Sequence, residues 1–65
     1  SSDDADQFAH RLNSKLAECV NAGYDRDATR VRMINLMCTP EGVEAGAGDS
    51  EPLYVLEGVL NKVYE

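Results

Sequence analysis

Cysteine, histidine and tryptophan are scarce in this sequence of 65 residues, which has two cysteines, one histidine and no tryptophan. Two cysteines form at most one bridge, whereas small secreted domains stapled by disulfides carry about four to eight cysteines. Cys19 and Cys38 are also expected at opposite ends of a helical hairpin, and the Cα atoms of bridged cysteines must lie within about 7 Å of each other. We therefore expect two free thiols.

Basic residues are few as well. Six lysines and arginines stand against twelve aspartates and glutamates, which gives a formal net charge of −6 at pH 7. Proteins bind phosphate backbones largely through lysines and arginines that displace counterions, so DNA and RNA repel an acidic chain. Nucleic acid is therefore not the partner that we expect.

Long hydrophobic runs are missing too. No apolar run in the sequence approaches the roughly 20 residues that a membrane-spanning helix needs. The first residues are acidic, where a signal peptide would be basic. We expect a soluble protein, most simply a cytoplasmic one, with no membrane partner.

The pattern that is present is helical. Apolar residues recur at steps of three and four over residues 3–22, which predicts a first helix, and Gly23 ends it in a left-handed conformation. Asp25 or Asp27 then caps a second helix, expected over 26–38. The connection between the two helices is only a few residues long, which indicates an antiparallel hairpin.

The rest of the chain predicts a loop over 39–51 and a third helix over 52–64. Thr39 and Pro40 are ambiguous, because proline ends the second helix and the same pair is typical of a new helix start. Pro52 suits the first turn of the last helix. Its expected buried stripe, including two residues that widen it, is Leu53, Leu56, Val59, Leu60, Val63 and Tyr64. The fold class is therefore all-α, a helical hairpin plus a third helix after a flexible loop, in one small three-helix domain spanning 1–65.

Residues that could carry chemistry form no recognisable site. His10 has no metal-ligating residue three or four positions later, so the spacing of a local metal site is absent. A nucleophilic site could pair His10 with Cys38. We do not favour this interpretation, because buried cysteines mostly pack as small hydrophobes. Met33, Met37 and Cys38 could offer sulfur to a soft metal, but packing explains them better. We expect no enzyme, no cofactor and no metal.

The second helix has more apolar surface than one neighbouring helix covers, because apolar side chains spread over about 220° of its circumference. Soluble monomers rarely expose apolar patches beyond a few hundred Å². A chain of this length also buries only about 60% of its unfolded surface, so self-association would support its small core. We therefore expect partner binding at Met33, Leu36 and Met37, together with Arg30.

Arginines concentrate in this same helix, and there are three of them: Arg26, Arg30 and Arg32. A solvated face paired with neighbouring aspartates is the simplest interpretation, and a contact for an anionic partner is the other. The function we expect is a small non-enzymatic protein–protein interaction module, a regulator or adaptor of a larger protein. Its free form would be a homodimer built on the second and third helices. The alternative is a helix-turn-helix-like regulator that reads nucleic acid with helix 26–38.

Overall fold

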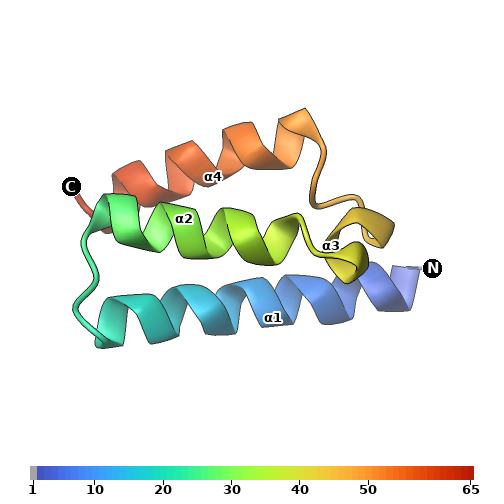
Figure 1. Cartoon of the computed structure of the whole chain (residues 1–65), viewed down its shortest axis with the longest axis horizontal. Coiled ribbons are helices and arrows are strands. Elements are labelled where there is room, and N and C mark those ends of the chain that lie inside the picture. The colour runs from blue at the N-terminus through green and yellow to red at the C-terminus, as the bar shows by residue number, and fades with distance from the viewer. Residues whose placement is uncertain (1) are drawn as a thin grey trace.

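The computed structural model describes residues 2–65, which form three long helices and one short one (Figure 1). In chain order they are α1 (Ser2–Asn21), α2 (Arg26–Met37), α3 (Pro40–Glu44) and α4 (Ser50–Val63). These residues contain no strand, so the predicted all-α fold is confirmed. Each long helix begins and ends within two residues of its predicted bounds. None of the four helices is long and apolar enough to cross a membrane.

The hairpin of α1 and α2 is closed by local signals. Gly23 adopts the expected left-handed conformation, with a φ of 80°. The N–H of Tyr24 donates to the carbonyl of Cys19 at 3.1 Å, which satisfies one of the last carbonyls of α1. The side chain of Asp25 then accepts a hydrogen bond from the N–H of Ala28 at 2.8 Å and caps α2. The chain therefore reverses within four residues, and the two helices run antiparallel (Figure 1).

The predicted loop over 39–51 is in part a helix. Pro40 occupies the first turn of α3, and the hydroxyl of Thr39 accepts a hydrogen bond from the N–H of Gly42 at 3.1 Å. Both interpretations of Thr39 and Pro40 are therefore right, because α2 ends there and a new helix begins. Gly46, with a φ of 82°, ends α3. Only a short turn then separates α3 from α4.

α3 lies directly against the end of α2 because Gly42 has no side chain. A Cβ at this buried position would lie 2.9 Å from the carbonyl oxygen of Leu36 and closer still to that of Met37. Backbone atoms cannot give way cheaply to such a contact. The close approach of α3 to α2 therefore requires glycine.

α2 is the central helix, as Figure 1 shows, and it contacts each of the other three helices. Its methionines are covered within the chain, because Met33 is 4% exposed and Met37 is 3% exposed. Six buried side chains make up the core cluster: Phe8, Met33, Met37, Ala47, Leu56 and Leu60. Most of the apolar arc of α2 is thus used in folding.

The buried stripe predicted for α4 needs correction at one edge. Leu56 and Leu60 are buried as expected, but Val59 is 38% exposed and Val63 is 42% exposed. Both valines lie on the border of the face that meets α2. The sequence predicted exposed apolar surface on the second helix. The structure has more of it on α4, where Tyr54 and further valines also face solvent.

Candidate functional site

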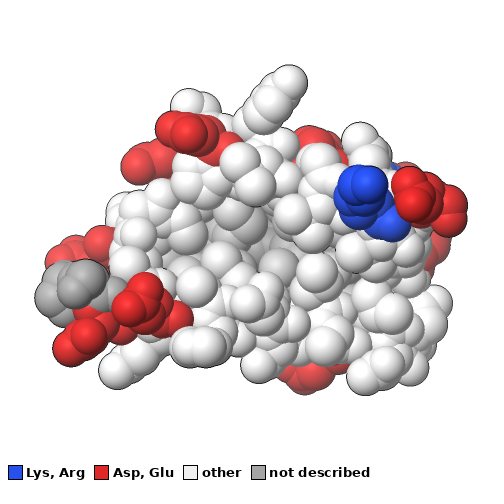
Figure 2. Space-filling view, turned by 180° about the vertical axis from the view of Figure 1, so that it is seen from behind, with Lys and Arg blue, Asp and Glu red and all other residues white. Residues whose placement is uncertain are grey.

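A groove lies between α1 and α4, above α2, with a volume of about 490 Å³. Met33 and Met37 belong to its lining, and because they come from the central, buried helix they form its floor. Figure 2 shows the molecule from this side, with a hollow at the centre of the face among uncharged side chains. The two methionines that the sequence assigned to a partner interface therefore lie together at the bottom of a groove.

Apolar side chains form both walls of the groove. The wall from α1 contains Leu12 and Leu16, which are one helical turn apart and only partly buried. The wall from α4 contains Pro52, Val55, Leu56 and Val59. Val55 is 57% exposed, so the rim of this wall presents apolar surface to water. Filling a groove of this composition with an apolar group removes apolar surface from water and therefore lowers the free energy.

The charged residues that line the groove are both acidic and lie at its end near the start of α4. They are Asp49 and Glu51. Among residues 2–65, neither carboxylate forms an ion pair, and Asp49 makes no capping hydrogen bond through its side chain. Figure 2 shows acidic side chains gathered toward this end of the face. The groove is thus apolar along its length and negative at one end.

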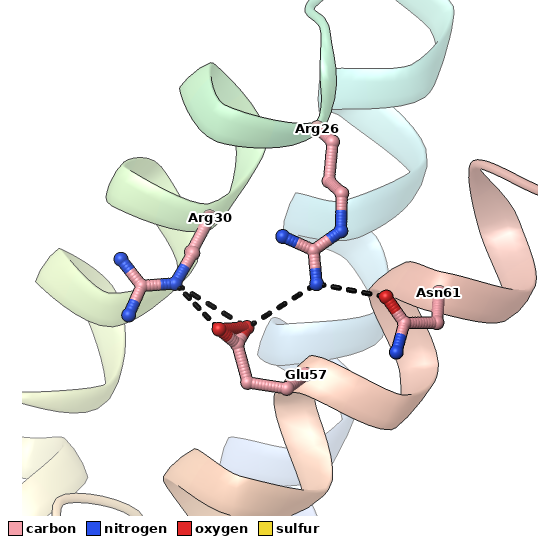
Figure 3. Close-up of polar contacts among 4 residues, drawn as sticks. All are labelled: Arg26, Arg30, Glu57 and Asn61. Carbon is pink, nitrogen blue, oxygen red and sulfur yellow. Dashed lines mark hydrogen bonds and ion pairs between the residues drawn. The ribbon is translucent and has the colours of Figure 1, made fainter.

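The other two predicted partner-binding residues lie elsewhere. Leu36 is half-buried and borders a shallow depression beside α1, outside the groove. Arg30 belongs to a polar network between α2 and α4 (Figure 3). Its Nε donates to Oε1 and Oε2 of Glu57 at 2.8 and 3.3 Å. Of the four predicted residues, the structure thus brings together only Met33 and Met37, and the binding role of all four stays a prediction.

The same network holds a second arginine of α2. Arg26 Nη2 lies 3.7 Å from Glu57 Oε2 and donates to Asn61 Oδ1 at 2.9 Å. Glu57 therefore lies between two guanidinium groups, as Figure 3 shows, and ties α4 to α2. Sequence analysis missed Glu57, because nothing in the local sequence indicates which carboxylate the arginines face.

The third arginine also contacts its own chain. The guanidinium carbon of Arg32 lies 3.9 Å from the centroid of the Tyr24 ring, which is a cation–π contact. Its Nη1 donates to the carbonyl of Ala28 at 3.1 Å. The arginine cluster of α2 is therefore engaged in contacts within the fold.

The residues considered for catalysis or metal binding are dispersed. His10 and Cys38 are exposed, whereas Cys19 is 1% exposed and belongs to the interior. Both cysteines are free thiols, as predicted. In the described part of the chain, histidine, cysteine and carboxylate side chains form no group of three that could hold a metal ion. Cys38 is exposed and does not line the groove, whereas Met33 and Met37 are buried and do.

No protein-family model, no curated protein and no solved structure matches this chain. Among the groove residues of α1 and α4, only Leu12, Leu16, Leu56 and Val59 lie on the apolar stripes that the sequence predicts, and one signal could have indicated the groove. The apolar stripe of α4 was wider than one helix contact needs, just as that of α2 was. Two wide stripes in a chain of this length indicate that some apolar surface stays open.

Proposed function

We propose that this chain is a small protein–protein interaction module, a non-enzymatic regulator or adaptor, which receives an amphipathic helix of a larger protein in the groove between α1 and α4. The observation that carries the proposal is the groove itself, with its apolar walls and its floor of Met33 and Met37. Helix-in-groove recognition places apolar anchors at positions i, i+3, i+4 and i+7 into such a groove. Methionine suits this role because its flexible thioether conforms to varied side chains.

The arrangement of the helices favours a helical occupant. α1, α2 and α4 lie side by side, with α2 in the middle (Figure 1). A partner helix laid along the groove would be the fourth long helix, would contact α1 and α4, and would cover Met33 and Met37 from the open side. The complex would then have the architecture of a four-helix bundle, in which each helix buries one apolar face.

The charge of the groove indicates the orientation and composition of that helix. Asp49 and Glu51 lie at one end, and no lysine or arginine lines the groove. Complementary charge raises the association rate and fixes the register of a complex. The expected partner helix therefore has one apolar face and carries lysine or arginine at the end that lies against Asp49 and Glu51.

The helix-turn-helix alternative is less well supported. A recognition helix must be free to enter the major groove of DNA, whereas α2 is the central helix of this fold. Arg26 and Arg30 face Glu57, and Arg32 lies on Tyr24. DNA binding would have to break these contacts and overcome the net charge of −6.

Selection of helical peptides from a display library tests the proposal. We expect binders with apolar residues at i, i+3, i+4 and i+7 and a basic residue at one end, and we expect their amide chemical-shift changes to map to the groove. Asn13 lines the groove and is exposed, so Asn13→Trp should fill it with little effect on stability. Asn35→Trp, at an exposed position of α2 outside the groove, is the matched control.

The selected peptides should bind the Asn35→Trp control as they bind the unmodified chain and should bind the Asn13→Trp variant at least about tenfold more weakly, a loss of about 1.4 kcal/mol. Glu51→Lys should weaken the same peptides through their basic end. Failure to select any helical binder would count against the proposal. So would binders that map outside the groove or that ignore Asn13→Trp.

A further inference from the structure

The outer face of α4 combines a projecting side chain with a hollow. Tyr54 is 82% exposed, the highest value among the large apolar residues of the described chain. One turn later, no atom lies within 4 Å of the position that a Cβ of Gly58 would occupy. A depression of about 570 Å³ lies over this glycine, and Tyr54 stands at its border. A knob and a hole therefore lie next to each other on one helix face.

Nothing in the fold of the monomer requires a glycine at position 58. Glycine inside a helix lowers helix stability relative to alanine, and neither space nor backbone conformation requires it here. Gly42 is different, because backbone atoms of α2 would collide with its Cβ. A contact from outside the chain would supply such a reason.

The charges along the same face are arranged with opposite signs at its two ends. Glu51, Val55, Gly58 and Lys62 follow one another at steps of four, three and four residues, so they form one stripe, the spacing of a helix–helix seam. Glu51 lies in the first turn of α4 and Lys62 in the last. Among residues 2–65, neither of these two side chains forms an ion pair.

A two-fold axis makes this face complementary to itself. If two α4 helices lie antiparallel, Tyr54 of one copy meets Gly58 of the other, and the reverse contact forms at the same time. The same axis brings Glu51 of each copy to Lys62 of the other, because both residue pairs are centred within one residue of Leu56. Shape and charge therefore select the same antiparallel register.

We propose that two copies of this chain associate through the outer faces of α4, antiparallel, with Tyr54 of each copy over Gly58 of the other and with Glu51 paired to Lys62. The absence of a side chain at Gly58 lets the two helices approach closely. Val55 adds apolar surface beside the central contact, being 57% exposed in the monomer. Glu51 and Val55 also line the groove, so the two surfaces share one edge of α4, whereas Tyr54, Gly58 and Lys62 lie outside the groove.

Sedimentation equilibrium over a range of concentrations measures the association directly. The unmodified chain should form a dimer that dissociates on dilution. Gly58→Gln fills the hollow with a good helix former, and Tyr54→Ala removes the knob. Each should raise the dissociation constant of the dimer roughly tenfold or more, as truncation of a central tyrosine does in other interfaces, while circular dichroism shows the same helix content. A chain that stays monomeric at all soluble concentrations would overturn the proposal.

Charge reversal tests the antiparallel register. Glu51→Lys alone and Lys62→Glu alone each place like charges together twice, so both should weaken the dimer. The double variant should restore it, and an equimolar mixture of the two single variants should form a mixed dimer. Glu18→Lys makes the same charge change at an exposed position of α1 and should have no effect on the dimer. Weakening by Glu18→Lys, or no restoration in the double variant, would contradict the register.

Two further measurements separate this interface from the groove. Asn13→Trp should block peptide binding without changing the dissociation constant of the dimer. Gly58→Gln should weaken the dimer and leave selected peptides bound as before. Glu51 lines the groove and also takes part in the dimer contact, so Glu51→Lys should weaken both properties. A weaker dimer in Asn13→Trp, or loss of peptide binding in Gly58→Gln, would contradict the interface.

Discussion

Thr29 and Tyr64 meet hydroxyl to hydroxyl, with Oγ1 and Oη 2.6 Å apart. Thr29 is completely buried, at 0% exposure. The hydroxyl of Tyr64 also donates to the carbonyl of Tyr24 at 3.0 Å. A tyrosine hydroxyl has a single hydrogen, so Thr29 must be the donor in the shorter bond. This chain of hydrogen bonds fastens the end of α4 to α2 and to the connection between α1 and α2.

Tyr64→Phe should lower the free energy of unfolding by about 1–3 kcal/mol, because it leaves the buried hydroxyl of Thr29 without its acceptor. Thr29→Val keeps the shape of the side chain and should cost less, since Tyr64 still bonds to Tyr24. Urea unfolding of both single variants and of the double variant completes a thermodynamic cycle. The double variant should be more stable than the sum of the single losses implies. Additive losses would show that the two hydroxyls are not coupled.

The helix ends of this fold could be predicted because their signals are local. Asp25 caps α2 and Gly23 ends α1 through interactions within a few residues of each position. Thr39 and Pro40 gave a correct start for α3, and the single turn that the sequence made plausible as far as 43–45 agrees with the observed helix Pro40–Glu44. The position of α3 against the end of α2 is a tertiary contact at Gly42, which no local signal could predict.

Gly42→Ala and Gly58→Ala should change stability in opposite directions. The first places a Cβ against the backbone of Met37 and Leu36, so α3 must shift, and we expect a loss of about 1–3 kcal/mol. The second meets no neighbouring atom and should gain up to about 1 kcal/mol from helix propensity. Urea unfolding at concentrations where the chain is monomeric compares the two. A stabilising Gly42→Ala would contradict the tight packing of α3.

Glu57→Gln should lower the free energy of unfolding only slightly, and the loss should disappear at high salt concentration. Glu57 accepts from Arg30 at 2.8 Å and lies 3.7 Å from Arg26, but these three charged side chains are 35–43% exposed. Exposed ion pairs contribute roughly 0–1 kcal/mol and are screened at high ionic strength. Unfolding of both proteins in low and in about 1 M salt measures this. A loss that persists unchanged at high salt would mean that Glu57 acts through packing instead.

The groove could be predicted only in part, and the reason lies in tertiary geometry. The wide apolar arc of α2 directed attention to Met33 and Met37, which line the groove floor, and their role in binding stays a prediction. Periodicity says how much of a helix is apolar, but not which neighbour covers it. That depends on where α1 and α4 are placed around α2, and here they cover both methionines while leaving Val55 and Val59 partly open.

Met33→Ala should therefore act as a core substitution and not as a surface one. Met33 is 4% exposed in the core cluster, and truncation of a buried methionine costs about 2–5 kcal/mol. That loss is large against the roughly 3–10 kcal/mol expected for the whole stability of a chain this short. Met33→Leu nearly conserves volume and should cost less than about 1.5 kcal/mol. Val55→Ala, at a rim position that is 57% exposed, should change stability by no more than about 0.5 kcal/mol. Thermal unfolding followed by circular dichroism ranks the three, and a Met33→Ala variant as stable as Val55→Ala would refute the buried placement of the groove floor.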